Sequence, residues 1–86
     1  MITVSYKPSF IKKVRHLDKE LYQEVLDKIE LLKDERDHTM LKVHKLHGHF
    51  KNCYSFSVDY RIRIIFQYES KKEVVLISIG DHEVYR

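Results

Sequence analysis

The sequence predicts an α+β fold: an N-terminal strand, a helical hairpin and a three-stranded antiparallel meander, with the helices packed on one face of a four-stranded sheet. Between Phe10 and Leu32, apolar residues recur at steps of three and four, which is typical of amphipathic helices. Between residues 54 and 79, apolar runs alternate with polar side chains at a period of two, which is typical of strands. Because the helical pattern precedes the strands as a block, we expect separate helical and sheet layers.

The composition is that of one small folded domain spanning residues 1–86. Of the 86 residues, 43% are apolar, and the chain has only two glycines and one proline, which argues against disorder. The single cysteine, Cys53, excludes an internal disulfide and favours a reducing compartment. No apolar run is long enough to cross a bilayer, and the N-terminus lacks the features of a signal peptide. We therefore expect a cytoplasmic protein with no membrane partner.

The N-terminal half contains the strand and the helical hairpin. Residues 2–6 alternate in polarity and predict a short strand, after which Ser9 is a candidate helix cap. The helical stripe consists of Phe10, Val14, Leu17, Leu21, Val25, Ile29 and Leu32. Asp18 stands where it can cap a second helix, so we expect a break between Leu17 and Leu21.

The C-terminal half contains the meander. A loop with a short strand is expected over residues 42–51, and strands at 54–58, 62–68 and 73–79. A two-residue loop after Val58 would turn Arg61 and Arg63 toward the core. A three-residue loop at 59–61 instead pairs Val58 with Ile62 and keeps both arginines outside, and we prefer it.

The last hairpin determines which side chains face the helices. A four-residue loop over residues 69–72 pairs Phe66 with Val75, so that Val75, Ile77 and Ile79 join the core. The opposite face of the sheet then carries Ile65, Val74 and Leu76. Such a patch would be exposed in a monomer, so we interpret it as a partner-binding surface.

The net charge of +3 is unevenly distributed. Residues 44–68 contain four lysines and arginines against a single acidic residue, together with His44, His47 and His49. A basic, histidine-rich stretch favours a polyanionic partner. The spacing from His44 to Cys53 matches no zinc-site pattern, so we expect neither a metal nor another cofactor.

Three stretches carry a resemblance to a known family. They are residues 44–51 (HKLHGHFK), residues 60–66 (YRIRIIF) and residues 79–86 (IGDHEVYR). In this order, the chain resembles the RelE/ParE superfamily of bacterial toxin–antitoxin toxins, and it is most similar to the RelE and YafQ branch of ribosome-dependent mRNA endonucleases. The resemblance implies a RelE-like fold and a type II toxin that cleaves mRNA in the ribosomal A site. It also implies a cognate antitoxin as partner, with operator DNA bound only through the toxin–antitoxin complex.

The resemblance also implies site residues. Metal-independent RNA cleavage uses the 2′-hydroxyl as nucleophile and needs a base, an acid and cations. We assign His82 as general acid, His44 as general base, Arg61 and Arg63 to the scissile phosphate, and Tyr85 to stacking on a base. The RNA backbone would contact Lys45, Lys51, His47 and Arg86. The antitoxin would contact the helical hairpin and the patch formed by Ile65, Val74 and Leu76.

Other interpretations remain open at this level. The chain departs from the YafQ-like pattern, with Ser57 in place of a strand histidine and Ser78 in place of an arginine before the terminal glycine. Taken singly, His82, Arg61 and Arg63 are also compatible with ordinary solvated side chains. A ParE-like toxin that binds DNA gyrase without catalysis, or a degenerate member that only binds its antitoxin, are the alternative functions.

Overall fold

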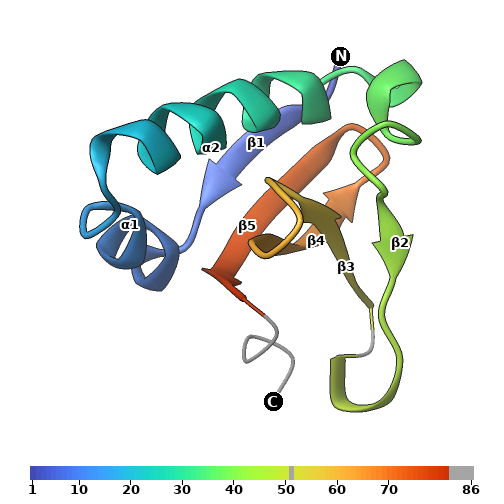
Figure 1. Cartoon of the computed structure of the whole chain (residues 1–86). Helices are drawn as coiled ribbons and strands as arrows, with labels where there is room; N and C mark the ends of the chain where they lie inside the picture. The colour runs from blue at the N-terminus through green and yellow to red at the C-terminus, as the bar shows by residue number, and fades with distance from the viewer. Residues whose placement is uncertain (51, 82–86) are drawn as a thin grey trace.

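Two helices lie against one face of a five-stranded sheet in the computed structural model, which describes residues 1–50 and 52–81 (Figure 1). The helical elements are α1 (Pro8–Val14), α2 (Lys19–Leu32) and the short 3-10 helices η1 (Glu35–Asp37) and η2 (Gly48–Phe50). The strands are β1 (Thr3–Tyr6), β2 (His44–Lys45), β3 (Cys53–Ser57), β4 (Arg63–Ser70) and β5 (Glu73–Gly80). This arrangement confirms the predicted α+β class and element order.

The two α-helices begin at residues suited to helix starts. Lys7 is extended at the N-cap of α1, and Pro8 follows at the first helical position, where its missing N–H is not needed. Ser9 is therefore not the cap, contrary to the sequence prediction, and its hydroxyl instead donates to the Ile77 carbonyl at 3.2 Å. Asp18 caps α2 as predicted, because its carboxylate accepts from the Leu21 N–H at 2.8 Å.

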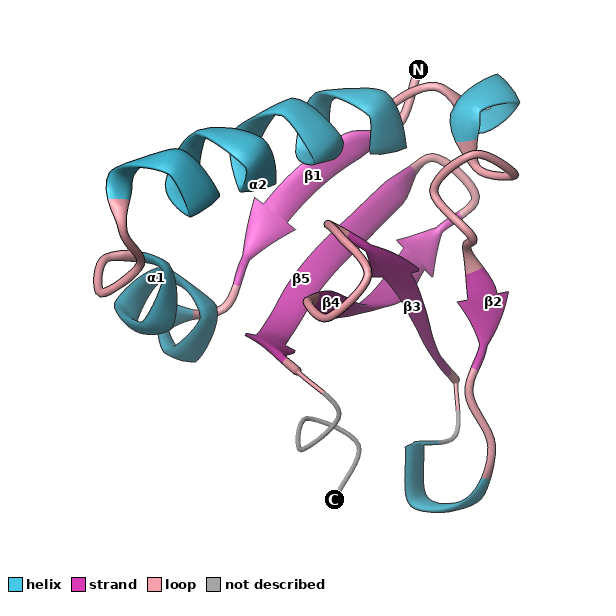
Figure 2. Ribbon diagram, in the orientation of Figure 1, coloured by secondary structure: helices cyan, strands magenta, loops and turns pink. Residues whose placement is uncertain are grey.

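The strand order is β1-β5-β4-β3-β2, with β1 parallel to β5 and all other pairs antiparallel (Figure 2). The sequence predicted four strands in the sheet, and the structure has five because the short strand β2 pairs with β3. The predicted three-residue loop is confirmed: Phe56 pairs with Ile64, and the Val58 N–H donates to the Ile62 carbonyl at 2.9 Å. The arginines therefore stay outside the helix-side core.

The predicted register between β4 and β5 is wrong. Ser70 pairs with Glu73, so the loop has two residues rather than four. Further along the hairpin, the register of the pairing shifts between Ile65 and Phe66. There, Ile65 pairs with Ser78 while Phe66 pairs with Leu76, which leaves Ile77 as the extra residue of a bulge. One extra residue exchanges the two faces of a strand, so the simple alternation predicted along β5 fails at this point.

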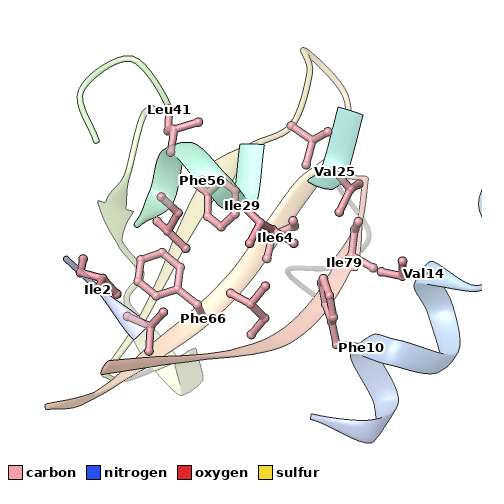
Figure 3. Packing of buried hydrophobic residues seen from close by; sticks show 14 residues of the cluster. Ile2, Phe10, Val14, Val25, Ile29, Leu41, Phe56, Ile64, Phe66 and Ile79 are labelled. Atoms are coloured by element: carbon pink, nitrogen blue, oxygen red, sulfur yellow. The ribbon is translucent and has the colours of Figure 1, made fainter. Parts of the chain in front are cut away.

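The core lies between the helices and the sheet (Figure 3). Its largest buried side chains include Phe56, Phe66, Ile64, Leu32 and Leu41, and each is at most 1% exposed.

The bulge corrects the predicted partner patch. Val74 and Leu76 belong to this core and are 1% and 0% exposed, and Ile65 is 2% exposed on the other face. None of the three is available to a partner in this conformation. Val75 is buried but lies outside the helix-side cluster, also contrary to the predicted pattern.

Within the described residues, no helix combines the length and apolar character needed to cross a membrane.

Candidate functional site on the helix-free face of the sheet

The face of the sheet opposite the helices, hereafter the open face, carries two transverse rows of residues that include the predicted site residues His44 and Arg63. The first row runs across four strands, because His44 pairs with Ser55, Ser55 with Ile65, and Ile65 with Ser78. The second row lies two residues further along β3 and consists of Ser57, Arg63 and Gly80. Since adjacent strands lie roughly 4.8 Å apart, the first row spans about 14 Å. Between the ends of the first row, Ser55 and Ile65 are buried, at 0% and 2% exposure.

His44 is held at one end of the first row by two hydrogen bonds. Its Nδ1 lies 2.9 Å from the Lys42 carbonyl, and its Nε2 lies 3.2 Å from the Ser55 hydroxyl. A carbonyl only accepts, so Nδ1 carries the proton, and in the neutral ring Nε2 accepts from Ser55. The Lys42 carbonyl belongs to a residue with φ of 59°, an uncommon left-handed conformation outside glycine. The imidazole thus has Nδ1 protonated and Nε2 directed to the Ser55 hydroxyl on the open face.

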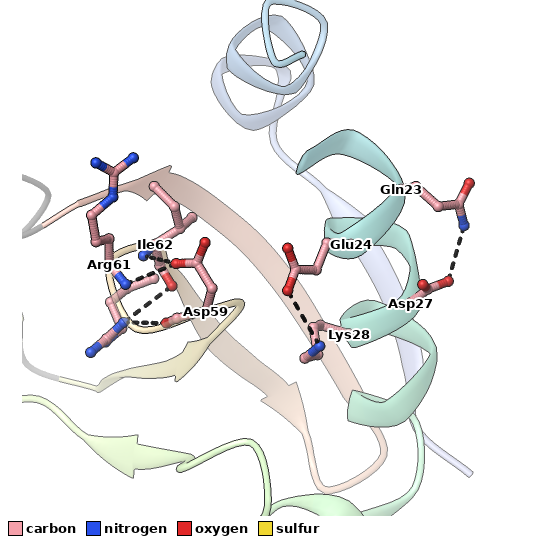
Figure 4. Close-up of polar contacts among 8 residues, drawn as sticks. Gln23, Glu24, Asp27, Lys28, Asp59, Arg61 and Ile62 are labelled. Atoms are coloured by element: carbon pink, nitrogen blue, oxygen red, sulfur yellow. Dashed lines mark hydrogen bonds and ion pairs between the residues drawn. The ribbon is translucent and has the colours of Figure 1, made fainter. Parts of the chain in front are cut away.

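Arg61 and Arg63 flank the turn between β3 and β4, which Asp59 organises (Figure 4). The Asp59 carboxylate accepts from the N–H groups of Arg61 and Ile62, at 2.8 and 2.7 Å. The Arg63 guanidinium donates to the Asp59 carbonyl at 2.8 Å, so it supports the turn as well as the open face. Arg61 is exposed, and Figure 4 shows its guanidinium directed away from the Asp59 carboxylate.

The Asp59 carboxyl group has a lowered pKa. Burial raises this pKa, but the N–H donors of Ile62 and Arg61 and the positive charges of Arg61 and Arg63 outweigh that effect. Asp59 is thus an anion that shapes the turn, and its Oδ1 accepts from two backbone N–H groups. Asp59 therefore orders the backbone of the turn next to which both arginines lie, and its carbonyl accepts from the Arg63 guanidinium.

The remaining predicted RNA-binding residues are not all brought together. Lys45 pairs with Tyr54, whose ring packs against the helix-side core, so Lys45 and His44 belong to opposite faces of the sheet. His47 is exposed between β2 and η2. The predicted site residues Lys51, His82, Tyr85 and Arg86 lie outside the described residues.

Lys13 of α1 is a residue at this face that sequence reasoning missed. Its Nζ lies 3.5 Å from the Ser78 hydroxyl, at the opposite end of the first row from His44. In sequence, Lys13 belongs to the polar side of an amphipathic helix, and no local signal distinguishes it from Lys12. Only the packing of α1 beside β5 places it there.

A second feature, of which the sequence predicted only that the helical hairpin is a contact surface, is an apolar groove between α1, α2 and β1, with a volume of about 370 Å³. Four of its large side chains are well exposed: Tyr6 (43%), Ile11 (40%), Tyr22 (42%) and Leu26 (38%). Its floor includes Phe10, Val25 and Ile29, and the Tyr6 ring stacks on Phe10 with centroids 5.8 Å apart. The signal in the sequence was the presence of apolar residues in both helices beyond the main stripe.

Metal-ligating side chains do not converge in the part of the chain that the structure describes: no group of three or more His, Cys, Asp or Glu residues there could hold an ion. The chemistry available at the open face is that of an imidazole base, guanidinium and ammonium cations, and hydroxyls. Such groups suit a phosphodiester better than an uncharged substrate.

The fold is that of RelE- and ParE-type toxins. Among solved structures, it is similar to the archaeal RelE–RelB complex from Pyrococcus horikoshii OT3, at 20% identity over 93% of each chain and a TM-score of 0.74. It is also similar to the YoeB/ParE toxin from Agrobacterium tumefaciens, at 15% identity over 94% of this chain and 99% of that chain, with a TM-score of 0.76.

A third similar structure is YafQ from E. coli strain BL21(DE3), at 17% identity over 99% of this chain and 98% of that chain, with a TM-score of 0.69. No protein-family model matches the sequence. No curated protein matches it either. At these identities, the likeness establishes the fold, and the function has to be argued from the site.

Proposed function

We propose that this chain is the toxin of a type II toxin–antitoxin system and an endoribonuclease that cleaves mRNA, with the ribosomal A site as the place of cleavage. The observation that carries the proposal is the position of His44, with Nδ1 bound to a carbonyl and Nε2 bound to the Ser55 hydroxyl on the face that also carries Arg63. A gyrase-binding protein has no need of a proton-transfer group held in this way. The shared fold with RelE- and YafQ-type toxins supports the same class.

The proposed reaction is a transesterification within the RNA. His44 Nε2 takes the proton of a ribose 2′-hydroxyl in place of its bond to Ser55, and the 2′-oxygen attacks the adjacent phosphorus. Arg61 and Arg63 stabilise the negative charge of the pentacoordinate phosphorane. The bond to the 5′-oxygen breaks and His82 protonates that oxygen, which leaves a 2′,3′-cyclic phosphate and a 5′-hydroxyl. Tyr85 stacks on a neighbouring base, and His47, Lys51 and Arg86 contact backbone phosphates.

The partner of this toxin is proposed to be a cognate antitoxin, which binds the apolar groove between α1, α2 and β1. Several of the structurally similar proteins were solved as toxin–antitoxin complexes, including the E. coli RelBE complex. The groove, rather than the patch predicted on the sheet, is where large apolar side chains are exposed. An amphipathic antitoxin helix would bury them against its own apolar side.

The test is primer extension on a cellular mRNA after induction of the chain. We expect cuts within translated regions, and their loss in His44→Asn and His82→Ala. Asparagine can still donate to the Lys42 carbonyl but is no base, so the rate should fall roughly 10²- to 10⁴-fold with the fold retained. His16→Ala, a change at an exposed histidine outside the proposed site, is the matched control. Undiminished cleavage by a folded His44→Asn protein would refute its role as base.

The same experiment separates the alternative functions. Growth arrest with intact mRNA, accompanied by filamentation and a DNA-damage response, would indicate gyrase binding instead. Intact mRNA without growth arrest would indicate a degenerate chain that only binds its antitoxin.

A further inference from the structure

We propose that Lys13 is a phosphate-binding residue of the RNA site, acting with Ser78 at the end of the first row opposite His44. This inference rests on the proposed ribonuclease function and adds a binding position for the RNA backbone that lies on a helix, outside the sheet. The position would hold a backbone phosphate away from the scissile one, because His44 and Lys13 flank a row about 14 Å long.

The first step of the argument is how α1 comes to border the open face. After β1 ends, the Lys7 N–H donates to the Leu76 carbonyl at 2.9 Å, and the Ser9 hydroxyl donates to the Ile77 carbonyl at 3.2 Å. The helix therefore lies alongside the last part of β5, where β1 no longer covers the strand. Ser9 and Lys13 are four residues apart and share one side of α1, so Lys13 is directed toward β5 as well.

The second step is the bulge at Ile77. Beyond it, Ile79 faces the core while Ser78 faces the open side, as its pairing with Ile65 requires. The Lys13 ammonium lies 3.5 Å from the Ser78 hydroxyl, so the lysine side chain reaches around the sheet edge to the open face. A uniform alternation with Ile79 in the core places Ser78 on this face as well, so the position of Ser78 does not depend on the bulge.

The third step is charge. Among residues 1–50 and 52–81, the ion pairs involve Lys28, Lys33, Arg36 and Lys72, and none involves Lys13. Lys13 is exposed, so its ammonium remains accessible to a soluble anion. Two donors then converge on one point, the ammonium of Lys13 and the hydroxyl of Ser78. This combination suits a singly charged phosphodiester oxygen.

The fourth step is the relation to the arginines. Arg63 pairs with Gly80, and Ser78 is the diagonal neighbour two residues away, at roughly 7–8 Å between Cα atoms. The Lys13 and Arg63 positions therefore belong to one continuous surface that one RNA strand can contact. The carboxylate of Asp59 is engaged by backbone N–H groups, and Asp81 follows Gly80 at the end of this surface.

The experiment measures binding of a fluorescent, fully 2′-O-methylated oligoribonucleotide, which cannot be cleaved, by anisotropy over a series of salt concentrations. Lys13→Ala should weaken binding roughly three- to tenfold at low salt and reduce the slope of log K against log salt by about 0.7. Lys12→Ala, which removes the same charge from the neighbouring exposed position, should change neither quantity. Lys13→Arg should retain most of the affinity, because it keeps the charge.

The outcomes distinguish this inference from the proposed function. Equal losses in Lys12→Ala and Lys13→Ala would overturn it, because they would reflect the general charge of α1. Loss of binding in Arg61→Ala with none in Lys13→Ala would also overturn it, while the ribonuclease proposal would stand. No binding by the parent chain even at low salt would overturn this inference, whereas the ribonuclease proposal is decided by the primer extension. Thermal unfolding of each variant identifies any loss caused by misfolding.

Discussion

Replacing Leu76 by alanine is expected to destabilise the protein by about 3 kcal/mol. Leu76 is completely buried on the helix side of β5, where it pairs with Phe66. The change removes three carbon atoms, worth roughly 0.8 kcal/mol each, and leaves a cavity among rigid neighbours that adds to the cost. A loss of this size would raise the unfolded fraction by roughly two orders of magnitude. It is also a large part of the total stability of small proteins, which is about 5–15 kcal/mol.

The neighbouring position provides the control. Ile77 is the extra residue of the bulge and is half-buried, so Ile77→Ala should cost less, about 1 kcal/mol. Urea denaturation followed by circular dichroism at 25 °C measures both free energies of unfolding. A uniformly alternating β5 reverses the expectation, with Ile77 in the core and Leu76 exposed. A larger cost for Ile77→Ala than for Leu76→Ala would therefore refute the bulge.

Two further predictions concern the groove and the turn. Leu26→Glu should weaken binding of the antitoxin at least tenfold, because it places a charge where the partner's apolar side would lie. Titration calorimetry measures the affinity, and Gln23→Glu on the same helix is the control. Equal affinities of the Leu26→Glu and Gln23→Glu variants would exclude the groove as the binding surface. Asp59 has a lowered folded-state pKa, so its stabilising contribution is present above its unfolded pKa near 3.8 and is lost as the pH falls through the folded value. Urea titrations from pH 6 to pH 2.5 should therefore show a smaller acid-induced loss of stability in Asp59→Asn, and identical pH profiles would contradict this role.

Local patterns were sufficient for most of the fold. The spacing of apolar residues predicted the two helices, and Asp18 predicted where the second begins, because a cap bonds only to its own first turn. The loop at residues 59–61 was predicted correctly because burying two arginines would be costly, which is a property of the residues themselves. Each of these decisions depends on interactions within a few residues of the chain.

Part of the candidate site was predictable for the same reason. The basic stretch containing His44, Arg61 and Arg63 was evident in the sequence, and its residues lie on the open face or in the turn beside it. The separation of Lys45 from His44 was also implicit in strand alternation, once a short strand was expected there.

Only the tertiary structure decided the faces of β5 and the surfaces that depend on them. A bulge adds one residue to a strand and thereby changes which of its residues are buried. The run from Val74 to Ile79 is apolar enough to form a strand either with or without the bulge. The choice between them depends on packing against β4 and the helices, which are distant in sequence. For the same reason, sequence alone determined that Lys13 is a cation on a helix, whereas the approach of α1 to Ser78 across 65 residues of chain decided that this cation borders the open face.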